Sequence, residues 1–450
     1  MSASRPQILV VGDLGGRASR GVHEPESLAA RPRLHVDRDE VEERMEQLGV
    51  EVQLPGGDRL PVRDIEHLEP DHLVDALGTF DRLRAIRRRL QDPKTFAEAA
   101  DEIGATAEEG VEDDDRPEGV PLPEGLLDAA IEAAQEPRPA GDPADDSGEA
   151  MVENLARRLV APHVVPRDDP RLPELLEAVD SGLREHTLTV LRDPSFQRLE
   201  DAWTVVDQLT RRLETGAGLE IRLLDATFDE LAAAAEDGNV ALGGAASEAP
   251  APDLVLVLHR FGGTARDARI LHAIADGLGA NGLLVADFDR PNSLPEGEAS
   301  AAWDALRAAH AASIALVVNR VPLRAPYGPR GASVERIAFD ELAHGGRAAR
   351  RLGSGAWTVA LLYGRMALES GGAPERLDAT LEVDRLPLAL VEEHGEVVQL
   401  PTAETFLGAS DLADLREQGL ASVRSVRGSD TALVGPVRAL DGDVLRRLGS

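Results

Sequence analysis

The chain has 450 residues, no cysteine, and a formal net charge of −33. The lack of cysteine excludes disulfides, thiolate zinc sites, iron–sulfur clusters and cysteine nucleophiles, and the negative charge disfavours nucleic-acid and anionic-membrane binding, because both need positive surface. No segment of the sequence has the ~18–20 apolar residues of a membrane span, and the early apolar run is too short for a signal peptide, so we expect a soluble, cytoplasmic protein.

The first hundred residues alternate between strand and helix patterns. An apolar run predicts a buried strand over 7–12, and a glycine-rich turn follows it. A short strand at 33–36, a helix capped by Asp39 and a strand–turn–strand hairpin over 50–60 come next. Apolar residues at three- and four-residue steps predict one amphipathic helix across 73–90, and a short helix follows over 92–104.

An acidic segment then divides the sequence. Residues 101–150 hold 17 Asp or Glu and two Arg, with many Pro and Gly. Such a composition cannot bury enough apolar surface to order itself. We therefore predict a first domain over 1–107, a flexible acidic linker over 108–150 with one short helix (Leu126–Ala134), and a second domain over 151–450.

The sequence pattern of the second domain predicts an α/β fold with a mainly parallel sheet flanked by helices. Helical patterns precede a series of apolar strands that alternate with further helices. The predicted helices cover 151–164, 171–214, 265–279, 298–310 and 343–370, and the predicted strands cover 219–226, 253–261, 282–287 and 313–319. A terminal α/β stretch follows.

The turn after the first strand invites a nucleotide-site interpretation. Arg17 and the amides of Gly15 and Gly16 are groups that could contact a phosphate. However, neither the G-x-G-x-x-G fingerprint nor G-x-x-x-x-G-K-[ST] is present, and Asp13 would place a negative charge beside the phosphate. A structural turn is the favoured alternative.

Two groups combine histidine with carboxylates at close spacing: His35, Asp37 and Asp39, and His67, Asp71 and His72. Alternating positions on a strand share one face, which would suit a metal ion in the first group. The alternative is that Asp37 and Asp39 cap the following helix. In the second group, Pro70 at a helix start and Asp71 in its first turn explain the pattern without a ligand.

The most enzyme-like position is the end of the strand at 282–287. Asp287 and Asp289 lie where α/β folds place ligands, but no base–nucleophile pair, G-x-S-x-G or H-E-x-x-H accompanies them. A solvated turn is the alternative. Trp203, Trp303 and Trp357 occur in helical apolar patterns, which indicates core packing.

Several motifs of residues 8–105 together resemble the small subunit of the type VI secretion contractile sheath. They are a strand ending in G-D-x-x-G-R, a V-D-R-D segment that opens a helix, and a segment with P-D before a long helix. The matching positions are Gly12, Asp13, Gly16, Arg17, Asp37, Arg38, Asp39, Pro70 and Asp71.

Residues 126–440 resemble the large subunit of the same sheath. The similar segments are "RDPSFQRLEDAW", "LEIRLLDATFDEL", "RVPLRAPYGP" and the "LPTAETF" stretch with the residues after it. The positions that carry the family motifs are Phe196, Leu199, Glu200, Trp203, Pro326, Tyr327, Pro401 and Thr402.

The resemblance implies a natural fusion of small and large sheath subunits, with a structural role, no catalytic residues, no cofactor and no metal. The implied partners are further copies, other sheath or baseplate subunits, an inner tube protein, and an unfolding ATPase that would grip the Leu126–Ala134 helix. The terminal segments that exchange strands between neighbouring subunits in the family are missing before Ile8 and after about residue 440. A non-polymerising adaptor that docks on sheath, baseplate or tube is therefore the alternative, and a nucleotide- or metal-dependent enzyme is a less favoured third.

Overall fold

A computed structural model describes residues 5–24, 28, 30–109, 169–216, 218–238, 240, 251–289, 296–343 and 346–448. The predicted Leu126–Ala134 helix, most of the predicted linker and the helix predicted over 151–164 lie outside these residues. The chain divides into two compact units. The first unit comprises 1–69, 192–333 and 339–450, and the second comprises 70–191 and 334–338.

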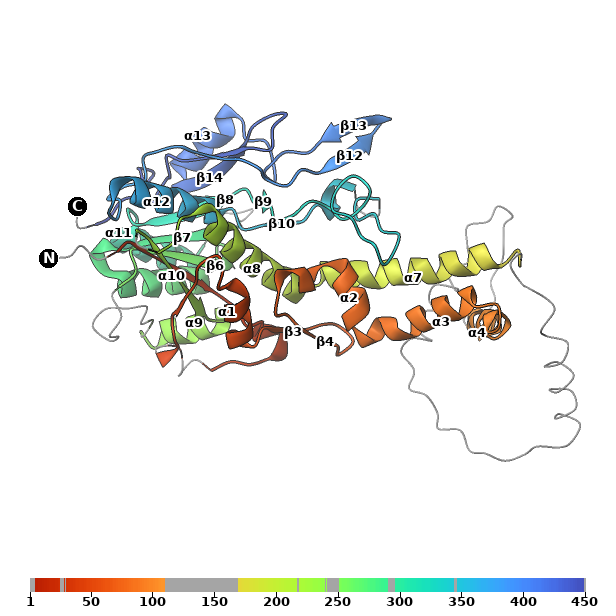
Figure 1. The fold of residues 1–450 in the computed structure, drawn as a ribbon. Helices are drawn as coiled ribbons and strands as arrows, with labels where there is room; N and C mark the ends of the chain where they lie inside the picture. Colours follow the sequence, from red (N-terminus) through yellow and green to blue (C-terminus); the bar gives the residue numbers. More distant parts are fainter. Residues whose placement is uncertain are drawn as a thin grey trace, which may run out of the picture. The chain divides into compact units, whose positions relative to one another are not determined.

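A nine-stranded, mostly parallel sheet forms the centre of the first unit (Figure 1). Its order is β11-β15-β14-β8-β7-β6-β1-β5-β2. The strands are β1 (Gln7–Gly12), β2 (Leu34–His35), β5 (Glu220–Asp225), β6 (Leu254–Phe261), β7 (Leu283–Phe288), β8 (Ile314–Val318), β11 (Leu381–Val383), β14 (Leu420–Ser425) and β15 (Ala432–Val434). The antiparallel pairs of this sheet in the described residues are β2–β5 at one edge and β14–β15 and β15–β11 at the other. The predicted α/β class with a mainly parallel sheet is confirmed.

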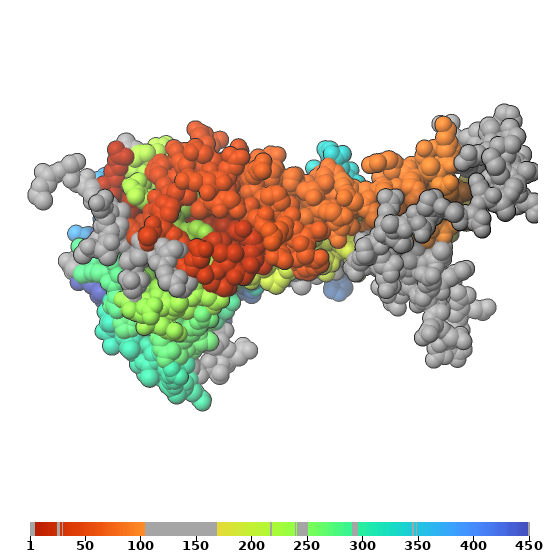
Figure 2. Space-filling model, turned by 90° about the horizontal axis from the view of Figure 1, so that it is seen from below, coloured from red at the N-terminus to blue at the C-terminus, as the bar shows by residue number. Residues whose placement is uncertain are grey.

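Strand β1 lies in the interior of this sheet although it comes first in the sequence. It pairs in parallel with β5 on one side and with β6 on the other, so that Ile8 aligns with Ile221 and Leu254. All six residues of β1 are buried. On the surface of this unit, Figure 2 shows N-terminal residues in red beside yellow-green residues that come much later in the sequence. Residues from both predicted domains thus build one sheet.

Helices cover both faces of the sheet. The helices α9 (Phe228–Glu236), α10 (Ala265–Leu278) and α11 (Glu298–His310) share one apolar core with side chains of the central strands. The helices α8 (Pro194–Arg212) and α12 (Ala356–Ser370) pack on the other face (Figure 1). Trp203 of α8 and Trp357 of α12 are fully buried, as their apolar patterns predict.

Smaller elements complete the first unit. The predicted hairpin over 50–60 is present as β3 (Glu51–Gln53) and β4 (Arg59–Pro61). The others are α1 (Val41–Leu48), α13 (Ala409–Glu417), the pair β9 (Val321–Pro322) and β10 (Leu352–Gly353), the hairpin β12 (Leu390–Glu393) and β13 (Glu396–Gln399), and the 3₁₀ turns η1 (Ala18–Arg20), η3 (Ile65–Leu68), η6 (Gly279–Asn281) and η7 (Gly346–Ala349).

The second unit is helical. It contains α2 (Pro70–Ala76), η4 (Gly78–Phe80), α3 (Asp81–Gln91), α4 (Phe96–Glu109) and most of α7 (Leu172–Arg192). Phe80 packs edge-on against His186 of α7, and Arg87 of α3 forms an ion pair of 2.6 Å with Asp180. The segment formed by η4 and α3 is therefore held to α7 by both an aromatic and a charged contact.

Three helix predictions are wrong in detail. The single helix expected across 73–90 is interrupted, because Leu77 adopts an extended conformation before Gly78, a poor helix former. The pattern over 171–214 forms two helices, because Asp193 and Pro194 start α8. The helix expected over 343–370 begins only at Ala356, after the short strand β10. No helix of the described residues is long and apolar enough to cross a membrane.

Candidate functional site

The backbone N–H groups of the turn after β1 already donate hydrogen bonds to other groups of the protein. The carboxylate of Asp13 accepts hydrogen bonds from the N–H groups of Arg17 (2.7 Å) and Ala18 (3.0 Å). Gly15 N–H donates to Asp225 over 2.9 Å, and Gly16 N–H donates to the Asp13 carbonyl. Acidic protein groups thus take the positions that a phosphate would need, which favours the structural turn over the nucleotide site.

Arg17 joins this turn to the end of β5 and to α9. Its guanidinium donates to Asp225 over 2.7 Å and makes a two-pronged contact with Glu230, one prong of which is 2.8 Å long. Arg31 donates to the same Glu230 carboxylate from the other side, at 2.7 Å for each of two bonds. The Glu230 side chain is completely buried, so both arginines compensate a charge that is shielded from water.

The protonation of the acidic groups follows from these contacts. Burial alone would raise the pKa of Glu230, but hydrogen bonds from Arg31 and Arg17 outweigh it and hold the pKa far below its usual range. Burial raises the pKa of Asp13, against the opposing effect of the two backbone N–H groups it accepts from. Glu230 is therefore a fixed anion at the centre of the cluster.

Two further contacts fix the position of the turn. Gly16 has a φ of +66°, and a Cβ atom there would lie 2.4 Å from the Glu51 carbonyl oxygen, so only glycine fits. Trp203 Nε1–H of α8 donates to the Leu14 carbonyl over 2.9 Å. Trp203, a motif residue of the second segment, thus contacts the turn that contains motif residues Gly16 and Arg17 of the first.

A second buried ionic cluster surrounds Glu200 of α8. Arg324 and Arg351 donate to its two carboxylate oxygens over 2.7 Å and 2.5 Å. Arg324 also pairs with Glu341 and lies 4.0 Å above the Tyr327 ring. Burial alone would raise the pKa of Glu200, but the charges of Arg324 and Arg351 lower it. The cluster anchors the loop around Tyr327 to α8.

The two carboxylates of the enzyme-like candidate have different partners. Asp287 is buried and accepts hydrogen bonds from the N–H groups of Gly355 (2.8 Å) and Ala356 (3.1 Å), at the start of α12. Asp289 is exposed and pairs with Arg260 over 2.6 Å. Because one carboxylate holds a helix start and the other forms a surface ion pair, they do not make a catalytic pair.

The remaining motif positions have structural contacts or are exposed. Asp71, after the buried Pro70, accepts hydrogen bonds from the N–H groups of Glu335 and Arg336. Thr402 donates to the Thr431 carbonyl over 2.6 Å. Phe196, Leu199 and Pro326 are apolar and buried. The Pro401 carbonyl accepts a hydrogen bond from Arg350. Arg38 and Asp39 are exposed.

The histidine–carboxylate groups differ from the sequence predictions. His35 Nδ1 lies 2.9 Å from Glu40, which also pairs with Arg44, and the ligand set that comes together is His35, Asp37 and Glu40, without Asp39. Nor does Asp39 cap α1, since the N-cap position is Glu40, whose side chain makes no capping hydrogen bond to the helix. The group of His67, Asp71 and His72 does not converge among the described residues.

One family model matches part of the chain. Residues 173–242 match the VipB model, whose description is EvpB/VC_A0108, tail sheath N-terminal domain. The match spans most of α7, all of α8, β5 and α9, and so includes Trp203, Asp225 and Glu230, three of the groups that hold the turn after β1. No curated protein matches the chain. The match supports a type VI sheath-like structural subunit related to the large sheath subunit, and it suggests a role without catalysis.

Proposed function

We propose that this chain is a structural subunit of a type VI secretion-type contractile apparatus, with a small-subunit-like segment (1–107) fused to a large-subunit-like segment (151–450). The observation that carries the proposal is the tail sheath match over 173–242. That matched segment provides Asp225, Glu230 and Trp203, the partners of the Gly12–Arg17 turn. The turn and its partners come from the two segments that resemble different subunits.

The shared sheet supports the fusion. Strand β1 of the first segment lies between β5 and β6 of the second, so neither segment completes its own sheet core. Joining two such segments in one chain fixes their ratio at one to one and raises their effective concentration. The proposed partners are further copies, other sheath or baseplate subunits and an inner tube. An unfolding ATPase would act at Leu126–Ala134. The proposal includes no cofactor.

The charge favours a second candidate, a sheath-derived adaptor that docks without polymerising. Each chain carries a formal charge of −33, so that neighbouring copies repel each other. Close packing would need screening by salt, local pairing of arginine with carboxylates, or a basic partner. A polymer of this chain should therefore assemble better at higher ionic strength.

Negative-stain electron microscopy of the purified full chain, combined with light scattering at low and high salt, distinguishes the two candidates. Hollow tubes or stacked rings, more abundant at high salt, are the result expected for a sheath subunit. A uniform particle of 48.0 kDa under every condition would overturn autonomous polymerisation and support the adaptor. Assembly that weakens steadily from low to high salt would contradict the repulsion argument.

A further inference from the structure

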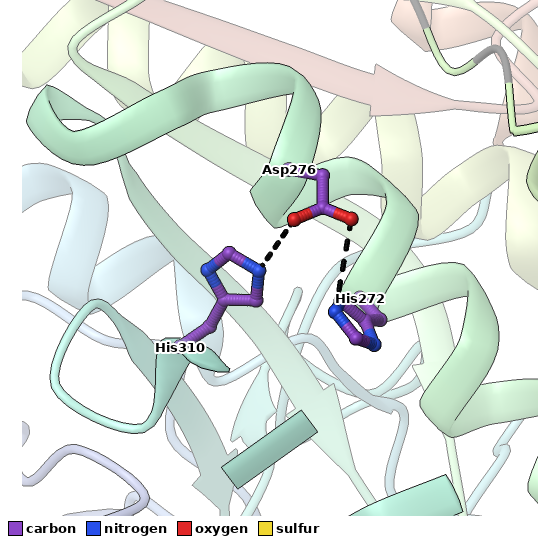
Figure 3. A group of neighbouring side chains, drawn as sticks. All are labelled: His272, Asp276 and His310. Atoms are coloured by element: carbon purple, nitrogen blue, oxygen red, sulfur yellow. Dashed lines mark hydrogen bonds and ion pairs between the residues drawn. The ribbon is translucent and has the colours of Figure 1, made fainter. Parts of the chain in front are cut away.

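A group of two histidines and one aspartate lies where α10 and α11 pack together (Figure 3). His272 and Asp276 are one turn apart on α10, and His310 is the last residue of α11. His310 Nε2 lies 2.8 Å from one Asp276 oxygen, and His272 Nε2 lies 3.7 Å from the other. The three side chains thus converge on one point from two helices.

The separations of these atoms suit a tetrahedral metal ion. One ligand atom from each residue lies within 4.8 Å of the others. Zinc binds histidine nitrogen and carboxylate oxygen at ~2.0–2.2 Å, which places neighbouring ligand atoms about 3.4 Å apart in a tetrahedron. The two histidine nitrogens approach different oxygens of the Asp276 carboxylate, over 2.8 Å and 3.7 Å, so the exposed carboxylate must turn for one oxygen to share an ion with both histidines.

Burial and charge at the cluster also favour a cation. The His310 side chain is only 10% exposed, and its Nε2 faces the Asp276 carboxylate (Figure 3). The neighbouring Arg269 is engaged with Glu298, and the overall negative charge attracts cations.

We propose that His272, Asp276 and His310 bind a divalent transition-metal ion, and that Zn²⁺ fits this ligand set best. Two neutral imidazoles and one carboxylate leave the fourth tetrahedral position for water. The bound ion would link the C-terminal turn of α10 to the end of α11. This inference is independent of the proposed function, because it concerns one chain whether or not the chain polymerises.

The test is isothermal titration of the full chain with zinc chloride. We expect one Zn²⁺ per chain, and we expect His272→Gln to weaken binding at least tenfold because it removes one of three ligands. His272 and the 64%-exposed Asp276 lie at the surface, so His272→Gln and Asp276→Asn should fold normally, which circular dichroism can verify. His35→Gln is the matched control, because in that group Arg44 already pairs with Glu40.

Thermal unfolding provides a second readout. Zinc should raise the Tm of the wild-type chain and of His35→Gln, because a ligand that binds only the folded state stabilises it. At the same zinc concentration it should raise the Tm of His272→Gln by clearly less than that of the wild type. The proposal is overturned if no saturable one-site binding occurs, if His272→Gln binds Zn²⁺ as tightly as the wild type, or if His35→Gln abolishes binding.

Discussion

Replacing Arg17 with methionine tests whether the buried charges hold the N-terminal turn to the rest of its unit. Methionine keeps the unbranched apolar stem and removes the guanidinium that contacts Asp225 and Glu230. Removing one partner from a buried ion pair costs about 3–5 kcal/mol. Because Arg31 still pairs with Glu230, we expect the free energy of unfolding to fall by about 3 kcal/mol, the lower end of that range.

Arg38→Met is the matched control for this substitution. Arg38 belongs to the same set of family motifs but is exposed, so its replacement should change stability by no more than about 0.5 kcal/mol. The assay is urea unfolding followed by tryptophan fluorescence, because Trp203 is hydrogen-bonded to the turn itself. If Arg17→Met and Arg38→Met destabilise equally, the turn is not held by its charges.

A double-mutant cycle isolates the contact between Arg17 and Glu230. Combining Arg17→Met with Glu230→Gln should cost less than the sum of the single changes, with a coupling energy of ~1–3 kcal/mol. The folded chain keeps the pKa of Glu230 far below its usual range. The pair therefore stabilises the fold at every pH above the usual pKa range of glutamate. That contribution should disappear only in strong acid. Additive effects of the two substitutions would refute the reasoning.

Two further predictions concern single positions. Gly16→Ala and Gly21→Ala both place alanine at a φ of +66°, but only the Gly16 Cβ meets a backbone oxygen, that of Glu51 at 2.4 Å. Chemical denaturation should therefore show a loss of about 1–2 kcal/mol for Gly21→Ala and a clearly larger loss for Gly16→Ala, and equal losses would contradict the steric argument. Burial raises the pKa of Asp201 to about 6, so the folded state should lose ~3 kcal/mol of stability as pH rises from about 4 to about 6. Asp201→Asn should flatten that dependence in denaturant titrations at several pH values, and an unchanged slope would show that Asp201 ionises normally.

Apolar runs predict which segments become central strands but not which strands become neighbours. The patterns at 7–12, 253–261, 282–287 and 313–319 correspond to β1, β6, β7 and β8. The position of β1 between β5 and β6 could not be predicted, because parallel pairing is set by packing over more than 200 residues of sequence. Local periodicity carries no information at that distance.

For the candidate sites, too, the sequence does not predict which distant residues come into contact. The absence of a phosphate-binding motif around Gly12 and Arg17 predicts a structural turn, yet the partner Glu230 is not evident from the turn. A local signal exists, because Thr227 and Glu230 form a capping box at the start of α9. The pairing of Asp287 with α12, and of His310 with α10, depends on which helices pack together.

The interior position of β1 also has a consequence for synthesis on the ribosome. Ile8 leaves the ribosome long before Ile221 and Leu254, the residues beside which it finally lies. At ~5–20 residues per second, about 10–50 s pass before both flanking strands have been made. During that time the nascent chain exposes an apolar strand that has no permanent neighbour. Early binding by a chaperone, or temporary pairing with another segment, would therefore decide how much of the newly made protein reaches its native topology.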